Sequence, residues 1–296
     1  MNRTLLIVAF SFALLGGRAV ADDQHVSIRP DGSVLHWSLR LPDTGRAAPL
    51  AVLAQGSGCA PALSGQAMHA AATAFAEYAV LTVEKYGVEP NDGPDEPSAC
   101  STTFAAQATM SQRIADYAQI IGELHGIAAW DGRLILFGGS EGGLVVARLA
   151  AQIHADAAIL LSAAPGIPFG EVVRAAVPAQ GQASLEQAFA AARRAPDSLE
   201  IWGGYSYRFW ADSIDRRVAD DMVTTTTPFL VIQGARDVLP VGGAYAVNGV
   251  FASADRTNLT YWEEAGYDHG MLDGDGRSHL AEVLTLAVEW TRQQLD

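Results

Sequence analysis

A short apolar run leads into a glycine-rich stretch at residues 134–143, Leu134-Ile135-Leu136-Phe137-Gly138-Gly139-Ser140-Glu141-Gly142-Gly143. The apolar run predicts a buried strand, and the segment Leu144–Ile153 that follows predicts a helix. A serine on a tight turn from strand to helix has strained backbone angles, and small neighbours let other backbone pass close to it. Such a turn raises the serine oxygen above the sheet edge, beside the amides of the helix N-terminus, which favour negative charge. We therefore predict that Ser140 is a nucleophile.

A glycine-rich turn can also bind phosphate, with an incidental serine. The stretch lacks the lysine of a P-loop, and it does not lie early in the chain, where a dinucleotide-binding fold has its glycines. The nucleophile is the better interpretation.

Short apolar runs alternate with helical segments along most of the chain. The other strand candidates are Leu50–Ala54, Val80–Val83, Ala157–Leu161, Phe229–Ile232 and Leu259–Trp262. Helical candidates are Pro61–Tyr78, Thr103–His125 and Leu280–Leu295. Alternation of this kind predicts an α/β fold, a mostly parallel sheet with helices on both faces. Val26–Arg29 and Val34–Leu41 flank the turn Pro30-Asp31-Gly32 and predict an antiparallel hairpin that leads into the sheet.

The alternation breaks in residues 166–227, which are rich in alanine and contain several prolines and glycines. We predict a helical cap inserted between two strands; the alternative, a separate helical domain, needs a longer segment. Aromatic residues gather here at Trp202, Tyr205 and Tyr207, which are candidates for binding substrate. The alternative is that they pack the cap onto the edge of the sheet.

A serine hydroxyl needs a base to remove its proton. His269 lies in a glycine-bracketed loop after the last strand candidate, and such a loop returns to the end of the sheet that carries Ser140. His279, at the start of the last helix, is the reserve candidate. Asp237 closes the Phe229–Ile232 strand and its following turn, where a carboxylate can orient the histidine.

Other carboxylates fit less well. Asp268 is adjacent to His269 in sequence, and adjacent residues rarely face each other correctly. Asp215, Asp220 and Asp221 have the pattern of solvated helix charges. We therefore predict the catalytic residues Ser140, Asp237 and His269.

Acyl transfer also requires donors for the oxyanion of the tetrahedral intermediate. The residue after the nucleophile, Glu141, should supply one backbone amide. The loop Gln55-Gly56-Ser57-Gly58 follows a strand candidate, and its glycines let a backbone amide approach closely. We favour the amide of Ser57 as the second donor, with Gly58 as the alternative and an ordinary glycine-rich turn as the simpler interpretation.

The first residues resemble a secretory signal peptide. Asn2-Arg3 is a positive start, Leu5–Leu15 is a short apolar run, and Ala19-Val20-Ala21 has small residues where cleavage occurs. The run is shorter than the roughly 20 residues needed to span a bilayer, so no stable membrane anchor is expected. We predict a signal peptide at 1–21 and a mature α/β domain at 22–296, exported to the periplasm or secreted.

Cys59 and Cys100 are the only cysteines. In an oxidising compartment a lone pair is more often joined than free, so we predict a disulfide, with two separate buried thiols as the alternative. Because Cys59 directly follows the Gln55–Gly58 loop, the bridge would fix the geometry of the oxyanion donors.

Composition excludes some partners. The 296 residues include 49% hydrophobic and 18% charged residues, enough for a sizeable core. The net charge of −14 disfavours nucleic acid, which is bound through lysine and arginine. Scattered histidines and two cysteines give no metal site, and the chemistry requires no cofactor. The expected partner is a small-molecule acyl substrate; the oligomeric state stays open.

The order Ser140, Asp237, His269 resembles that of the α/β-hydrolase superfamily, and the resemblance covers nearly all of the mature chain. It implies an eight-stranded, mostly parallel sheet with a variable cap. The sequence Gly-x-Ser-Glu-Gly-Gly at the nucleophile is similar to that of bacterial esterases and peptidase-like hydrolases. The Gln55–Gly58 loop departs from the common His-Gly start, which leaves open which amide serves.

Fold alone does not give function, and three hypotheses follow. The first is hydrolysis of a carboxylic ester or thioester through an acyl-enzyme. The second is a serine peptidase for short peptides, with Glu141 or Glu84 binding a free amine. The third is a binding protein that keeps the fold without turnover, which a complete set of three catalytic residues disfavours.

Overall fold

The computed structural model describes residues 23–92, 100–239 and 241–295, and the predicted signal peptide at 1–21 lies outside these ranges. The strands are β1 (Asp23–Ile28), β2 (Val34–Arg40), β3 (Ala48–Ala54), β4 (Ala79–Val83), β5 (Trp130–Gly139), β6 (Ala157–Leu161), β7 (Ile201–Trp202), β8 (Tyr205–Ser206), β9 (Phe229–Gly234) and β10 (Leu259–Glu264). The helices are α1 (Gln66–Ala74), α2 (Thr102–Gln107), α3 (Met110–Leu124), α4 (Glu141–Ala150), α5 (Phe169–Ala176), a 3-10 turn (Ala179–Gly181), α6 (Gln182–Arg194), α7 (Tyr207–Ser213), α8 (Ala219–Met222), α9 (Val241–Tyr245), α10 (Val247–Ser253) and α11 (Leu280–Leu295).

Eight of the strands form one sheet in the order β1-β2-β4-β3-β5-β6-β9-β10. Strand β2 is antiparallel to both of its neighbours, and all pairs from β4 to β10 are parallel. The predicted hairpin and the mostly parallel eight-stranded sheet are therefore confirmed. The interior strands β4, β6 and β9 are buried along their whole length and β3 is buried at all but one residue, because helices cover both faces of the sheet there.

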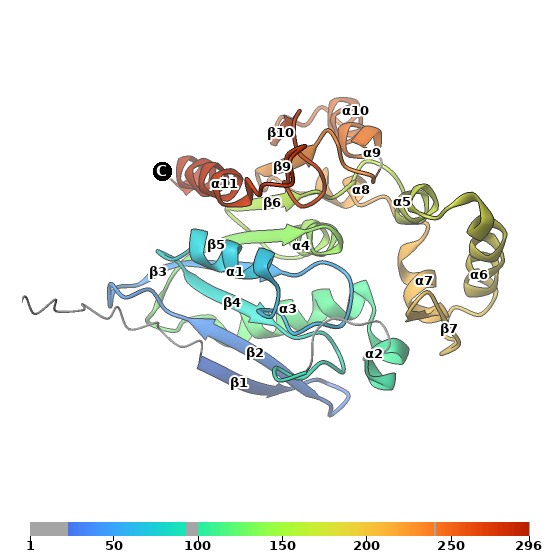
Figure 1. Cartoon of the computed structure of the whole chain (residues 1–296). Coiled ribbons are helices and arrows are strands. Elements are labelled where there is room, and N and C mark those ends of the chain that lie inside the picture. The colour runs from blue at the N-terminus through green and yellow to red at the C-terminus, as the bar shows by residue number, and fades with distance from the viewer. Residues whose placement is uncertain (1–22, 93–99, 240, 296) are drawn as a thin grey trace, which may run out of the picture.

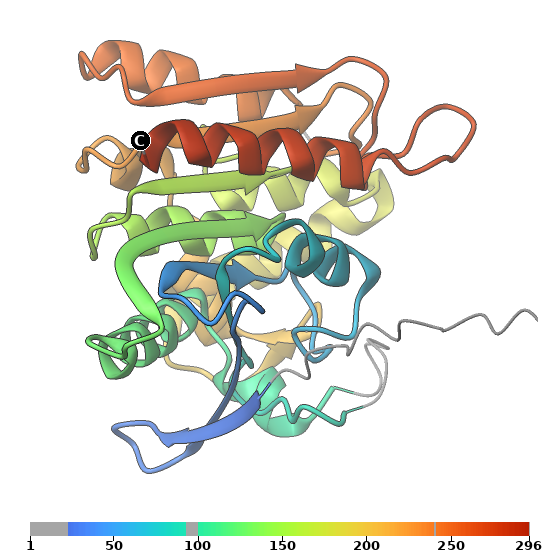
Figure 2. The same cartoon turned by 90° about the vertical axis from the view of Figure 1, so that its left-hand side faces the viewer.

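Helices on opposite faces of the sheet build two cores. Leu50, Val52 and Ala54 of β3 pack on the side of α3 and α4, whereas Ala51 and Leu53 pack on the side of α1 and α11. The side chains of one strand alternate between the two cores, as the period of a strand requires. Figure 2 shows α11 lying across one face of the sheet.

Two of the predicted helices are shorter or more divided than their sequence patterns indicate. The prediction of one helix over Thr103–His125 is wrong, because Ala108 and Thr109 have extended backbone and separate α2 from α3. The side chain of Thr109 accepts the backbone N–H of Gln112 and so begins a new helix. In Pro61–Tyr78 only the residues of α1 are helical.

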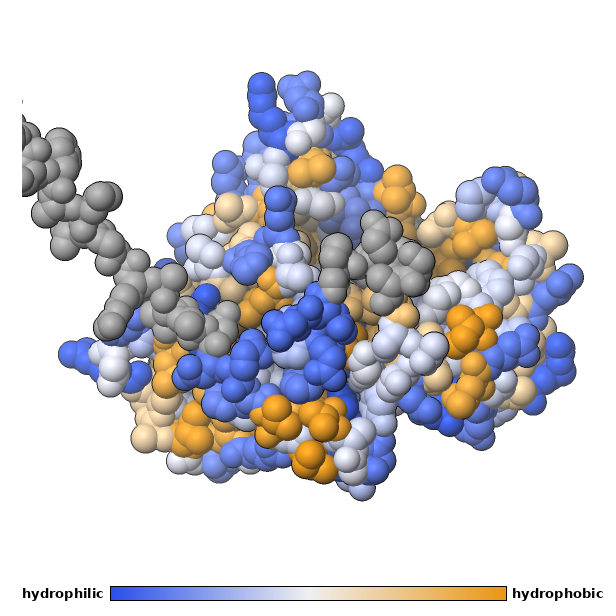
Figure 3. All heavy atoms as spheres, turned by 60° about the horizontal axis from the view of Figure 1, so that its bottom comes forward, coloured by the Kyte–Doolittle hydropathy of each residue, from blue (hydrophilic) through white to orange (hydrophobic). Residues whose placement is uncertain are grey.

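Residues 166–227, which we call the cap, lie between β6 and β9. They contain α5 to α8 and a small hairpin of β7 and β8, which extend to one side of the sheet in Figure 1. The cap is the lobe at the right of Figure 3. Val26 and Ile28 of the edge strand β1 are exposed. Within the described part of the chain, no helix has the length and hydrophobicity that crossing a bilayer requires.

The turn from β5 into α4 is built on glycines that have no room for a side chain. A Cβ on Gly138 would lie 2.2 Å from the carbonyl oxygen of Gly142, and a Cβ on Gly142 would lie 2.1 Å from that of Ala54. Both contacts are with backbone, which cannot move aside as a flexible side chain can. Gly139, between them, has open space around its Cβ position.

Gly138→Ala should therefore lower the free energy of unfolding by about 3 kcal/mol or more, because an inserted methyl group must displace backbone. Gly139→Ala is the matched control one residue away and should change it by about 1 kcal/mol or less. Urea unfolding of both variants beside the wild type measures the difference. Equal stability of the two variants would contradict this account of the turn.

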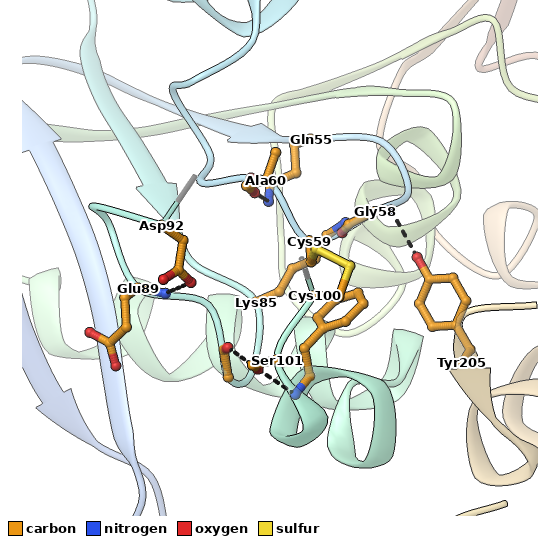
Figure 4. Close-up of a disulfide and its surroundings, with 12 residues drawn as sticks. Gln55, Gly58, Cys59, Ala60, Lys85, Glu89, Asp92, Cys100, Ser101 and Tyr205 are labelled. Atoms are coloured by element: carbon orange, nitrogen blue, oxygen red, sulfur yellow. Dashed lines mark hydrogen bonds between the residues drawn. A yellow bond between two sulfur atoms is a disulfide. The ribbon is translucent and has the colours of Figure 1, made fainter. Parts of the chain in front are cut away.

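The predicted disulfide between Cys59 and Cys100 is present and closes a loop with a sequence separation of 41. It joins the chain after β3 to the residue just before the N-cap of α2. Figure 4 shows the bridge beside Lys85, close to the loop that ends at Gly58.

Replacing both cysteines by alanine should lower the free energy of unfolding by about 4 kcal/mol, because the unfolded chain gains the entropy of an open loop. Urea unfolding under non-reducing conditions measures the change. Reducing agent should destabilise the wild type and leave the double variant as it is; an unchanged wild type would contradict a stabilising bridge.

Candidate active site

Ser140 lies at the junction of β5 and α4 in a strained conformation. Its φ is 54° and its ψ is −124°, values that a residue with a side chain rarely adopts. The backbone N–H of Ser140 donates to the carbonyl of Leu161 at 2.8 Å, which fixes the turn to the end of the neighbouring strand β6. The strain is held by surrounding backbone, and strain of this kind is typical of functional residues.

His269 and Asp237 meet across 32 residues of sequence. Nδ1 of His269 and Oδ2 of Asp237 are 2.8 Å apart. The side chain of Asp237 is fully buried, whereas that of His269 is 38% exposed. In the neutral tautomer that donates its Nδ1–H to this carboxylate, Nε2 carries no proton and can act as a base.

Asp237 is ionised by its surroundings. Burial by itself raises the pKa of this carboxyl. Hydrogen bonds from His269, from the Leu239 backbone N–H and from Gln233 lower the pKa by more than burial raises it, so that it lies below its ordinary value. The Leu239 amide donates to Oδ1 at 2.8 Å and the Gln233 side chain to Oδ2 at 2.7 Å. These partners hold the carboxylate in one orientation toward His269.

The loop that carries His269 is fixed from two sides. The hydroxyl of Ser162, just after β6, donates to the carbonyl of His269 at 2.8 Å. Asp268 accepts the backbone amides of Gly270 and Leu272, so it shapes the loop and does not pair with the imidazole. The carbonyls of Tyr267 and Asp268 also lie against Gly234 at the end of β9, where a Cβ would come within 2.5 Å.

The reserve candidate His279 has other partners. Its Nδ1 lies 2.9 Å from Glu282 and its Nε2 lies 3.1 Å from Asp273, and the ring stacks on Tyr267. Both ring nitrogens are engaged by carboxylates. Hydrogen bonds to these carboxylates raise the pKa of His279, which disfavours the neutral form that a base needs.

Ser57 and Glu141, the predicted oxyanion donors, line the same cavity as Ser140. Glu141 is the first residue of α4, so its N–H has no acceptor within the helix. The alternative donor, the N–H of Gly58, donates to the hydroxyl of Tyr205 at 2.9 Å. Of the two loop amides, that of Gly58 is therefore already used in a hydrogen bond to Tyr205.

A buried polar network surrounds the Gln55–Gly58 loop. Arg113 of α3 donates to the Gln55 carbonyl at 2.8 Å and to the Glu141 carboxylate at 2.7 Å. Lys85, which follows β4, donates to the carbonyls of Gly56 at 2.6 Å and Gly58 at 2.5 Å. The place of Lys85 after a strand at this end of the sheet is visible in the sequence, but its contacts and those of Arg113 depend on segments that are distant in the chain.

Two cavities meet at Ser140. The first has a volume of about 190 Å³ and extends under the cap helix α5. Its lining residues are Ser57, Ser140, Glu141, Leu144, Ser162, Ala163, Ala164, Phe169, Val172, Val173, Ala176, Val177 and Leu239. The second has a volume of about 210 Å³ and contains His269. It is lined by Gly56, Ala67, Met68, Phe137, Gly139, Ser140, Leu161, Ser162, His269, Gly270 and Leu280.

The predicted substrate-binding aromatics lie outside the linings of both cavities. Trp202 packs on the cap residue Trp210, with ring centres 5.5 Å apart, and Tyr205 stacks on Phe209. Tyr207 donates to Glu200 at the surface of the cap. These three side chains therefore contact other residues of the cap and not the cavities. The part of the cap that lines the first cavity is α5. The sequence signal for α5 is its apolar row Phe169, Val172, Val173 and Ala176, which follows a helical period.

Among the described residues, no three or more histidines, cysteines, aspartates and glutamates gather in an arrangement that could hold a metal ion.

Solved structures with the same fold cover nearly the whole chain. Est1E from Butyrivibrio proteoclasticus has 20% identity and a TM-score of 0.66, covering 92% of this chain and 98% of that one. The mouse alpha/beta hydrolase domain-containing protein 10 has 16% identity and a TM-score of 0.60, covering 93% of this chain and all of that one. An acylaminoacyl peptidase from Pyrococcus horikoshii has 15% identity and a TM-score of 0.62, covering 93% of this chain but only 41% of the peptidase.

No family model and no curated protein matches the sequence. The comparison therefore rests on structure. The eight-stranded sheet, its single antiparallel interior strand and the matched structures show that the chain has the α/β-hydrolase fold.

Proposed function

We propose that the protein is a serine hydrolase that cleaves a carboxylic ester or thioester through an acyl-enzyme on Ser140. The observation that carries this proposal is that the His269–Asp237 pair and Ser140 lie at the same cavity. His269, oriented by the buried carboxylate of Asp237, lines the cavity that also contains the strained Ser140. Nucleophile, base and orienting acid in this arrangement are the requirements for serine catalysis.

In the first half-reaction, Nε2 of His269 takes the proton of the Ser140 hydroxyl as its oxygen attacks the substrate carbonyl. The backbone amides of Ser57 and Glu141 bind the oxyanion of the tetrahedral intermediate. His269 then gives its proton to the leaving alcohol or thiol, and the acyl group stays on Ser140. In the second half-reaction, water loses a proton to His269, attacks the acyl-enzyme and releases the carboxylic acid.

The two cavities fit the two parts of an ester. The leaving group must reach His269 to receive its proton, so it belongs in the cavity that contains His269. The cavity under α5 contains both expected oxyanion donors and is otherwise mostly apolar, which suits the acyl group. The similar Est1E has been solved with ferulic acid bound, at 22% identity and a TM-score of 0.68. That acid belongs to the class of product proposed here, a carboxylic acid.

A peptidase that recognises the free amine of a short peptide needs a carboxylate at the site. Glu141 lines the cavity, but its carboxylate is bonded to Arg113. Glu84 accepts the Ala62 amide with both oxygens and lines a different cavity, which does not include Ser140. Neither described glutamate is therefore available for an amine, and we favour the ester.

We also propose that the protein is exported, to the periplasm or outside the cell. The apolar run with small residues before Asp22 and the disulfide between Cys59 and Cys100 support this location.

Purified mature protein should hydrolyse p-nitrophenyl acetate and butyrate, and Ser140→Ala should lower kcat by about 10⁴-fold or more. The kcat/KM for butyrate should exceed that for acetate by about tenfold, because two further methylene groups enter an apolar cavity. Ser253→Ala, on the remote helix α10, is the matched control and should keep wild-type turnover.

Labelling by a fluorophosphonate separates the alternatives. If the wild type is inert toward every ester but is labelled at Ser140, the substrate class is wrong and short peptides are tested next. If it is neither active nor labelled, the catalytic interpretation fails and the binding-protein hypothesis is tested next.

Glu84 makes stability depend on pH. Burial raises the pKa of this carboxyl to about 7, from 4.5 in a model compound, despite the Ala62 amide and the nearby Lys85. Between these pH values the folded protein holds a proton that the unfolded chain has lost, so raising the pH destabilises the fold.

The variant Glu84→Gln has no carboxyl at this position, so it should not lose this part of its stability as the pH rises. Its free energy of unfolding relative to wild type should therefore increase between pH 4 and pH 8, by on the order of 3 kcal/mol. Urea unfolding across this range measures the difference, with Glu289→Gln on the exposed side of α11 as control. A difference between Glu84→Gln and wild type that stays constant with pH would show that Glu84 does not ionise upon unfolding in this range.

A further inference from the structure

Lys85 is the only lysine in the chain; the other 18 of the 19 basic side chains are arginines. It is 2% exposed, and its ammonium donates to the carbonyls of Gly56 and Gly58, at 2.6 and 2.5 Å. These carbonyls flank Ser57, the residue whose amide the proposed function assigns to the oxyanion. The single lysine therefore binds the Gln55–Gly58 loop, which supplies one of the two amides that the proposed reaction needs.

The bond to Gly56 sets the direction of the Ser57 amide. In a planar trans peptide the C=O and the following N–H point in opposite directions, and the described peptide bonds include no cis bond. Because the Gly56 carbonyl points at Lys85, the N–H of Ser57 points away from it. Gly56 itself passes over the nucleophile, since a Cβ on it would lie 3.5 Å from the Cβ of Ser140. The Ser57 amide has no protein acceptor within the described part of the chain.

Tyr205 holds the same loop from the cap. A two-residue turn of Gly203 and Gly204, both with positive φ, brings it out of the β7–β8 hairpin, and its ring lies between Phe104 and Phe209. Its hydroxyl accepts the Gly58 N–H and donates to Glu141 at 3.4 Å. Burial raises the pKa of Tyr205, so the hydroxyl stays neutral and can both accept the bond from Gly58 and donate the bond to Glu141. Figure 4 shows Tyr205 directed at Gly58, with Lys85 on the side of the disulfide.

An ammonium suits this position better than a guanidinium. Two carbonyls that are two residues apart converge on one nitrogen, and an ammonium is a compact donor of three hydrogen bonds. The planar fork of arginine is built for two parallel acceptors and is larger. We propose that Lys85 is a positioning residue for acyl transfer, which fixes the Gly56–Ser57 peptide so that the Ser57 amide faces the reacting carbonyl, with Tyr205 holding the other side of the loop. This inference rests on the proposed function.

The test is Lys85→Met, assayed on p-nitrophenyl butyrate well below its melting temperature. The variant should lose about 100-fold in kcat, as expected for one oxyanion donor, with KM within about threefold of wild type. Asn258→Leu is the matched control. Asn258 donates to two loop carbonyls two residues apart, Thr225 and Thr227, but at the opposite end of the strands. It should lower the melting temperature and keep kcat.

Turnover and Ser140 labelling of the wild type are measured first, because their absence would overturn the proposed function and not the inference on Lys85 alone. With an active wild type, a kcat for Lys85→Met within threefold of wild type overturns the positioning role. An equal loss of kcat in Asn258→Leu also overturns it, because lost stability would then explain both. If Lys85→Met does not fold, Tyr205→Phe decides: it keeps the ring contacts, and kcat should fall about tenfold because the Gly58 amide loses its acceptor. Unchanged kcat in Tyr205→Phe would contradict the proposal.

Discussion

The backbone of Gly142 lies directly against the chain that leaves β3, so close that a Cβ would come within 2.1 Å of the Ala54 oxygen and 2.6 Å of the Gln55 oxygen. This contact joins the first turn of α4 to the end of the neighbouring strand. The two amides proposed to bind the oxyanion come from these two segments, Glu141 from α4 and Ser57 from the loop after β3. Their separation therefore depends on backbone packing, which cannot relax through a side-chain rotation.

The sequence predicts the sheet and the three proposed catalytic residues because both follow from local patterns. The limits of β6 and α11 agree to the residue with the predicted Ala157–Leu161 and Leu280–Leu295. In a parallel sheet the carboxyl ends of the strands share one edge, so residues that follow strands meet there. Asp237 and His269 each follow a strand, and the structure places them 2.8 Å apart.

Contacts between distant segments are not visible in such patterns. The aromatic residues of the cap are evident in the sequence, but only the fold shows that Tyr205 packs against Phe104 and that α5 lines the cavity. Lys85 follows β4 and reaches the loop after β3 because these two strands are neighbours. The sequence shows that Lys85 is the only lysine among 19 basic residues, but it does not show which carbonyls the ammonium contacts.

Glu141 raises an electrostatic problem that Arg113 resolves. A carboxylate one residue after the proposed nucleophile Ser140 would by itself oppose the negative charge that would develop on a tetrahedral intermediate. Arg113, 4% exposed, neutralises it at 2.7 Å. A buried pair of this kind contributes little net stability, and breaking it leaves an unpaired charge. The same guanidinium holds the Gln55 carbonyl, and Glu141 also accepts from Tyr205. Removal of either charge would therefore disturb the Gln55–Gly58 loop and the cap together. The proposed oxyanion site gives a reason for the pair that fold stability does not provide.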